Sequence, residues 1–350
     1  MLRTRARPGP DIGAVTGAGQ TTPFYAGGPD GARPGDGGGP GRATRVRPAR
    51  PAADTAALEG VPVLHDNGDM AQEAGSRLHG GSDGPGRYGE RMFRPGDEGE
   101  SARIDLGALT YDPLTLARLR QLGAGPGWRC LDVGAGTGTV ARALLREAGV
   151  AEVVAADRDI RFLRDRPLPG LTPVEADVTS DRFGPALFGP ARFDLVHARF
   201  VLMHLPSPAR MIERLAGLLA PGGVLVVSDA VDLTTGTAPD TPYTIALRAM
   251  WQGLRRTIGT DVSWVPHCPQ LMVAAGLESV AAEIHVPPLI PGSPNNRFWA
   301  RTWDRARPVM VATGLVDDAG IDEAERWLDD PTGAALSPGM LTAWGRRPGP

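Results

Sequence analysis

The stretch CLDVGAGTGTV, residues 130–140, decides the fold of this chain. It begins as an apolar run, continues into a helix-like segment, and carries Gly134, Gly136 and Gly138 at alternate positions between the two. Glycine lets the backbone turn sharply and approach a ligand closely, and doubly wound sheets bind ligands where their strands end. The stretch therefore predicts a ligand-binding loop between a strand and a helix.

The spacing of these glycines argues against a dinucleotide. A NAD-binding loop reads Gly-x-Gly-x-x-Gly, with pyrophosphate at the helix N-terminus, but Thr139 stands where the third glycine would be. Asp132 adds a carboxylate that repels pyrophosphate and suits a ligand with an ammonium group. Asp157 and Asp177 end the next two predicted strands, where they could accept hydrogen bonds from ribose hydroxyls and from an adenine amino group. NAD binding and purely structural turn glycines stay as alternatives.

Outward from this loop, strand-like and helix-like segments alternate. Apolar runs separated by helices are typical of a parallel sheet covered on both faces, so the chain is predicted to be α/β with a doubly wound, mostly parallel sheet. The predicted strands are 128–133, 152–157, 172–177, 193–198, 224–229, 277–286 and 340–348. The predicted helices are 139–149, 208–223, 244–259, 269–276, 297–314 and 322–330. Residues 102–123 also have helical spacing, and Pro113 predicts that a second helix begins within them.

In this order, the motifs resemble those of class I S-adenosylmethionine-dependent methyltransferases. The matching motifs are Asp-x-Gly-x-Gly-x-Gly (132–138), the acid that ends the second strand, Ala-Asp-Val (176–178), Phe-Asp-Leu-Val (193–196) and Leu-Ala-Pro-Gly-Gly-Val-Leu (219–225). The resemblance implies a Rossmann-like sheet of seven strands, the last antiparallel, and S-adenosyl-L-methionine as cofactor. The cofactor-binding residues that it implies are Asp132 at the methionine end, Gly134, Ala135, Gly136 and Gly138 in the loop, Asp157 at the ribose, Asp177 and Val178 at the adenine, and Arg158 and Arg199.

The methyl acceptor is expected over the ends of the fourth and fifth strands. His204 and Asp229 are the candidate catalytic residues there, as a base or to orient the acceptor. His204 could instead cap or pack a helix start, and Asp229 could be a solvated strand end. His197, within a strand, is interpreted as a hydrogen-bonded core residue. Trp299 and Trp303, four residues apart, either pack in the core or form a lid over the acceptor.

Several classes of acceptor do not fit the sequence. No Asn/Asp-Pro-Pro-Tyr/Phe motif follows the fourth strand, which argues against methylation of a nucleic-acid base or an amide nitrogen. No carboxylate at the end of that strand suits Mg²⁺, so no metal is expected. The net charge of −3 predicts no basic face for nucleic acid. A small, largely apolar molecule remains, with oxygen as the favoured acceptor atom. The alternatives are C- or N-methylation of a quinone-like or secondary metabolite, and a non-catalytic protein that binds the cofactor on the same fold.

The first hundred residues differ in composition from the rest. They hold 22 of the 47 glycines and 11 of the 34 prolines, a density without a repeat that favours disorder. Residues 1–95 are therefore predicted to be a disordered extension, and 96–350 a methyltransferase domain with a helical lid insertion around 290–335. With two cysteines, no long apolar run and no apolar signal segment, we expect a cytoplasmic protein without a membrane partner.

Overall fold

The computed structural model describes residues 87–349, apart from 190–191, 234 and 333–334. The chain divides into two units, Met1–Arg77 and Leu78–Pro350, and all described residues belong to the second. Residues 1–86 of the predicted disordered extension lie outside the described residues.

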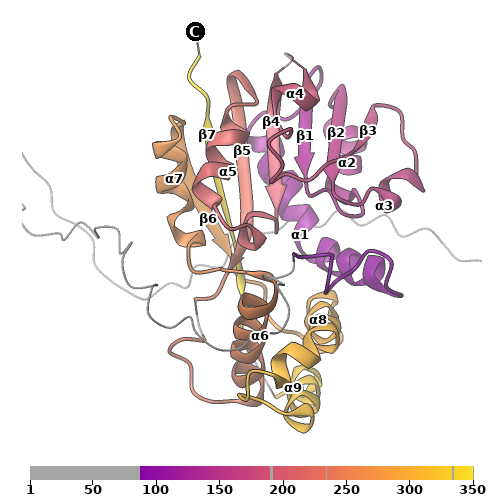
Figure 1. Cartoon of the computed structure of the whole chain (residues 1–350), viewed down its shortest axis with the longest axis vertical. Coiled ribbons are helices and arrows are strands. Elements are labelled where there is room, and N and C mark those ends of the chain that lie inside the picture. Colours follow the sequence, from indigo (N-terminus) through magenta and orange to yellow (C-terminus); the bar gives the residue numbers. More distant parts are fainter. Residues whose placement is uncertain (1–86, 190–191, 234, 333–334, 350) are drawn as a thin grey trace, which may run out of the picture. The chain divides into compact units, whose positions relative to one another are not determined.

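Within the described chain, seven strands form a sheet in the order β3-β2-β1-β4-β5-β7-β6 (Figure 1). The strands are β1 (Arg129–Val133), β2 (Glu152–Asp157), β3 (Leu171–Glu175), β4 (Phe193–Arg199), β5 (Leu219–Val231), β6 (Glu278–His285) and β7 (Gly339–Arg346). The first five pair in parallel, whereas β7 runs antiparallel to both β5 and β6. The predicted doubly wound α/β sheet with an antiparallel last strand is confirmed.

Helices flank the strands along the chain. They are α1 (Glu100–Gln121), α2 (Thr139–Ala143), α3 (Arg161–Arg164), α4 (Pro185–Phe188), α5 (Pro208–Ala216), α6 (Pro242–Ile258), α7 (Cys268–Ala274), α8 (Pro294–Val311) and α9 (Asp318–Asp329). A π-helical turn, Leu144–Ala148, continues α2, and 3-10 turns cover Leu202–His204 and Val265–His267. Within the described residues, no helix is both long and apolar enough to cross a membrane.

Both faces of the sheet are buried. Cys130 and Leu131 of β1 point to opposite faces because side chains alternate along a strand. Cys130 shares a buried cluster with Leu119 of α1, and Leu131 shares another with Ile212 of α5. Burial of a large apolar side chain contributes roughly 1.5–3 kcal/mol, so each face favours an apolar residue at every position. This explains why the strands read as unbroken apolar runs.

Helix α1 is continuous, so the prediction of a second helix starting at Pro113 is wrong. Proline removes the backbone hydrogen bond to the carbonyl four residues earlier, which here belongs to Leu109. Leu109 exposes 65% of its surface, so water can reach this side of the helix. On the opposite side, Tyr111 and Thr115 are buried and hold the helix against the rest of the domain.

Helices α6, α8 and α9 form a second layer, which lies below the sheet in Figure 1. Their buried faces meet around Trp303, which is completely buried and belongs to this core. The stretch predicted as a lid, 290–335, supplies α8 and α9, and α8 also contacts α1. Met92 and Phe93 are buried in the same cluster, so the prediction that the extension runs to residue 95 is wrong for residues 87–95. These two apolar side chains supply burial that the Gly- and Pro-rich composition had argued against.

Candidate active site

A cavity of about 520 Å³ lies where the carboxyl ends of β1, β2 and β4 face α1, α6 and α8. Nine of the ten predicted cofactor residues line it, Gly138 being the exception, and they form what we call the carboxylate end. The rest, called the aromatic end, is lined by His204 and by apolar side chains. These include Tyr88, Phe93, Tyr111, Met250, Trp251, Leu254, Phe298 and Trp299. Of the two candidate catalytic residues, His204 faces the cavity and Asp229 does not.

All three glycines of the loop adopt the left-handed backbone conformation, with φ of 65° at Gly134, 54° at Gly136 and 76° at Gly138. A Cβ atom on Gly134 would overlap the Cγ2 atom of Val201, and one on Gly138 would lie 2.5 Å from Leu163 Cδ2. On Gly136 the nearest such atom is 3.8 Å away. Packing therefore requires glycine at the first and third positions, whereas the second borders open space in the cavity.

Asp157 ends β2 and ties the glycine loop to that strand. Its Oδ2 accepts a hydrogen bond from the N–H of Gly136 at 2.8 Å, and its Oδ1 accepts one from the N–H of Asp159 at 3.1 Å. Burial raises the pKa of Asp157, although these backbone hydrogen bonds work against the shift. Each carboxylate oxygen has two lone pairs, so Asp157 can still accept hydrogen bonds from two ligand hydroxyls.

Asp132 and His197 are neighbours across the β1–β4 pairing. Nδ1 of His197 lies 2.8 Å from Oδ1 of Asp132, and both side chains are buried. His197 is thus a hydrogen-bonded core residue, as predicted, although it also borders the cavity. Within the described chain, Oδ2 of Asp132 is buried without a hydrogen-bond partner. A buried acceptor of this kind calls for a donor from a ligand or a water molecule.

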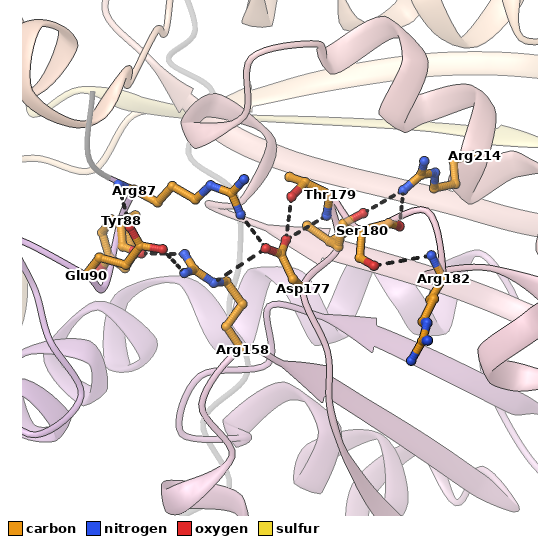
Figure 2. A network of polar contacts seen from close by, with 10 residues as sticks. Arg87, Tyr88, Glu90, Arg158, Asp177, Thr179, Ser180, Arg182 and Arg214 are labelled. Atoms are coloured by element: carbon orange, nitrogen blue, oxygen red, sulfur yellow. Dashed lines mark hydrogen bonds and ion pairs between the residues drawn. The ribbon is translucent and has the colours of Figure 1, made fainter. Parts of the chain in front are cut away.

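Asp177, just beyond β3, is the centre of a polar network (Figure 2). Its Oδ1 accepts hydrogen bonds from the N–H and the hydroxyl of Thr179, at 2.8 and 2.6 Å, while its Oδ2 pairs with Arg87 and lies 4.0 Å from Nε of Arg158. Burial works to raise the pKa of Asp177, but Thr179 and the two guanidinium groups outweigh it and hold that pKa below its ordinary value. The carboxylate is therefore ionised. The neighbouring Val178 is buried.

The guanidinium of Arg199 is already engaged within the protein. It donates hydrogen bonds to Asp112 Oδ1 at 2.6 Å and to Thr115 Oγ1 at 2.9 Å, which links β4 to α1. The contact with Asp112 is an ion pair. Arg199 also lines the cavity, so its positive charge lies at this wall.

His204 lies at the aromatic end, in the 3-10 turn that follows β4. Its Nδ1 is 2.9 Å from Oγ1 of Thr260, and its ring centroid is 4.4 Å from that of Tyr88. Burial, with a contribution from the Arg103 guanidinium, lowers the pKa of His204 to about 3. The imidazole is therefore neutral near pH 7, and Nε2 is the nitrogen left for a ligand.

Asp229, on β5, is buried behind the turn that carries His204. The backbone N–H groups of Val201, Leu202 and Met203 face its carboxyl group, although neither oxygen makes a hydrogen bond of normal geometry with the described residues. Burial raises the pKa of Asp229 to about 8. This placement suits a residue that supports the turn, and it leaves the carboxyl group without access to the cavity.

We expect Asp229→Asn to flatten the dependence of stability on pH. The unfolded carboxyl group ionises near its ordinary pKa and the folded one near 8, so the free energy of unfolding of the wild type falls as the pH rises between about 4 and 8. The advantage of the variant over the wild type should grow by a few kcal/mol between pH 5 and pH 9, since each unit of pKa shift is worth about 1.4 kcal/mol. Urea denaturation at both pH values measures this, with the exposed Asp181→Asn as control. Parallel curves for wild type and Asp229→Asn would contradict the assignment.

Arg103 was not singled out by the sequence, yet it organises the aromatic end. It is buried, pairs with Glu100 through bonds of 2.6 and 3.0 Å, and donates to the hydroxyl of Tyr88 at 2.8 Å. Its guanidinium also lies 4.6 Å from the ring centroid of Phe93 and 5.5 Å from that of Phe298. The available signal was the occurrence of two aromatic residues, at 88 and 93, directly before a helix.

The carboxylate end fits S-adenosylmethionine. The unpartnered Oδ2 of Asp132 suits an ammonium group, reached directly or through water. Open space lies beside Gly136, and the carboxylates of Asp157 and Asp177 can accept from ribose hydroxyls and an adenine amino group. Among the residues that the structure describes, no three His, Cys, Asp or Glu side chains are grouped as metal ligands.

Comparisons with known proteins agree with this fit. A family model described as a methyltransferase domain matches residues 104–279, half of the chain. Over 104 residues, or 29% of this chain, the sequence is 35% identical to methyltransferase str3 of Strobilurus tenacellus and 36% identical to a ubiquinone biosynthesis O-methyltransferase of Xylella fastidiosa. The solved structure of Haemonchus contortus phospholethanolamine N-methyltransferase 2, with S-adenosylhomocysteine bound, is 14% identical, with a TM-score of 0.45 over 74% of this chain and 60% of that one.

The aligned segment spans 35% of the length of the Strobilurus relative and 42% of that of the Xylella relative. The family match is broader, because residues 104–279 contain the first five strands and every predicted cofactor-binding residue. The chain belongs to the methyltransferase domain family of class I, whose cofactor is S-adenosylmethionine.

Proposed function

We propose that this chain transfers the methyl group of S-adenosylmethionine to an oxygen atom of a small, largely apolar molecule. One observation carries the proposal: the carboxylate end continues into an aromatic end that presents a neutral His204. The name of the Xylella relative, a ubiquinone biosynthesis O-methyltransferase, supports oxygen as the acceptor atom.

At the carboxylate end, the bound cofactor supplies an electrophilic methyl group on its sulfonium. Asp132 would hold the ammonium group of the methionine part, Asp157 the ribose hydroxyls, and Asp177 with Val178 the adenine. The glycine loop would lie against the methionine part, where Gly136 leaves room. Because the methyl group is already activated, the protein has mainly to position the two reactants and exclude water.

At the aromatic end, the hydroxyl of the acceptor has to lose its proton as its oxygen attacks. A neutral imidazole beside the hydroxyl can accept that hydrogen bond, and Thr260 fixes the orientation of the His204 ring. With a pKa of about 3, His204 is a weak base, so its role is to orient the hydroxyl and to receive the proton only while the new bond forms. The rings of Trp251 and Trp299 line this end and reduce access of water.

We expect His204→Ala to lower kcat for methyl transfer to a phenol by about 100-fold, the usual effect of losing a positioned proton acceptor. The affinity for S-adenosylmethionine should change little, because His204 is not among the residues expected to hold the cofactor. His204→Gln keeps a hydrogen-bond acceptor and should recover part of the rate. The assay is transfer of labelled methyl groups to a panel of phenols, quinols and amines, with cofactor affinity from calorimetry.

His267→Ala is the matched control, because this histidine is exposed and does not line the cavity. The kcat of the wild type should show no titration of His204 between pH 6 and 8, since its pKa is about 3. Products methylated at carbon or nitrogen, identified by NMR, would replace oxygen as the acceptor atom. Tight cofactor binding with no transfer to any acceptor class would favour the non-catalytic alternative.

A further inference from the structure

We propose that residues 87–93, which we call the latch, close the cofactor site and in the same movement place Tyr88 as a specificity-determining wall of the acceptor site. The role of Tyr88 in the acceptor site rests on the methyl transfer proposed above. Closure by residues 87–93 depends only on cofactor binding.

The tip of the latch is fastened to the carboxylate end by charge. Arg87 pairs with Asp177, and Glu90 pairs with Arg158, which also donates a hydrogen bond of 3.2 Å to the carbonyl of Tyr88 (Figure 2). Asp177 is expected at the adenine, and Arg158 is also a predicted cofactor-binding residue. The latch therefore lies across the part of the cavity where the cofactor is expected to bind.

The two ends of the latch are held with different strength. At its C-terminal end, Met92 and Phe93 are buried in the helical cluster. At the tip, by contrast, 54% of the Arg87 side chain and 45% of the Glu90 side chain are exposed, and exposed ion pairs stabilise weakly and are screened by salt. Within the tip, Gly89 has a φ of 81°, which glycine adopts without strain, and its N–H donates a hydrogen bond of 2.9 Å to the carbonyl of Met92. The tip can therefore open by breaking its exposed ion pairs and this backbone hydrogen bond, while Met92 and Phe93 stay buried.

Tyr88 joins the tip to the aromatic end. Its ring lies 4.4 Å from the ring centroid of His204 and stacks on Phe93 at 5.1 Å. Its hydroxyl accepts a hydrogen bond of 2.8 Å from the buried Arg103. Since Tyr88 lies between Arg87 and Glu90 in the chain, opening of the tip would withdraw this ring from His204. Closure over the cofactor and completion of the acceptor wall are thus coupled.

The test of closure compares the full-length wild type with Arg87→Ala/Glu90→Ala, using S-adenosylhomocysteine as the probe. We expect the double variant to release the probe about tenfold faster, the factor expected from losing a small network of exposed ion pairs. Amide hydrogen exchange in a peptide covering residues 88–95 should be faster in the variant and slower in the wild type once the probe is bound. Raising the salt concentration should speed release from the wild type and have little effect on the variant.

The matched control is Arg120→Ala/Glu147→Ala, which removes an exposed Arg–Glu pair of 3.7 Å outside the cavity. If the latch variant releases the probe and exchanges amides as this control does, the latch is refuted while cofactor binding stands. If the wild type does not bind the probe, both the latch and the proposed function are refuted.

Tyr88→Leu tests the acceptor wall separately. We expect KM for the acceptor to rise at least fivefold, with a changed order of preference among acceptors, because one ring of the wall is lost. Release of S-adenosylhomocysteine should be less affected than in Arg87→Ala/Glu90→Ala, since the ion pairs of the tip remain. Unchanged KM values and preferences would overturn the role of Tyr88, and a folding defect would be seen independently in the thermal unfolding of the variant.

Discussion

Asp157→Ala is expected to lower the affinity for S-adenosylmethionine by about 100-fold or more. Two ribose hydroxyls would lose a charged acceptor, and a hydrogen bond to a charged group is worth about 1.5–3 kcal/mol. In the wild type the N–H of Gly136 donates a hydrogen bond of 2.8 Å to Asp157. The variant removes this acceptor, so the glycine loop loses its hydrogen bond to β2. Isothermal titration calorimetry with S-adenosylmethionine measures the effect.

Two further variants separate recognition of the cofactor from support of the loop. Asp157→Asn keeps an oxygen that can accept from Gly136, although its NH2 group then faces the N–H of Asp159, so it should retain more thermal stability than Asp157→Ala and still lose most of the affinity. Asp165→Ala removes a carboxylate from an exposed position at the end of α3 and should bind the cofactor as the wild type does. Wild-type affinity in Asp157→Ala would show that this carboxylate does not hold the ribose.

Gly134→Ala is expected to abolish cofactor binding and to destabilise the domain. The new Cβ atom would overlap Cγ2 of Val201, and the residue would have to keep a left-handed φ of 65°. The backbone conformation alone costs roughly 1–2 kcal/mol for a residue other than glycine. The overlap adds to this cost, because Val201 itself lines the cavity and cannot move without changing its shape. Thermal unfolding and calorimetric titration with S-adenosylmethionine report the two effects.

Gly149→Ala provides the control for backbone strain. Its φ of 71° is similar, but no atom lies within 4 Å of a Cβ placed there. This variant should lose only the stability that the left-handed conformation costs and should bind the cofactor normally. Val201→Ala added to Gly134→Ala removes the overlapping Cγ2 atom and should restore part of the stability. Equal destabilisation in Gly134→Ala and Gly149→Ala would show that the contact with Val201 has no effect.

The positions of the strands along the chain, and the residues of the carboxylate end, could be predicted from the sequence. Each of these features is local, because Asp132 and the glycines follow one strand directly and Asp157 and Asp177 close the next two. Parallel strands bring their carboxyl ends to one edge of a sheet, so residues at those ends gather without any further information. The continuity of α1 through Pro113 was less accessible, because it depends on which side of the helix is exposed.

The aromatic end and the latch were decided only by the tertiary structure. Tyr88 meets Arg103 and His204, which are 15 and 116 positions away, and Arg87 meets Asp177 across 90 positions. Trp299 borders the cavity and Trp303 belongs to the core. They lie four residues apart on α8, so helical spacing alone does not tell which of them faces the cavity. The sequence by itself determined the parallel strands and the gathering of Asp132, Asp157 and Asp177 at one edge of the sheet, because each follows or ends a strand of the same direction. Which of the remaining side chains face the cavity depended on packing between distant segments, which no local pattern records.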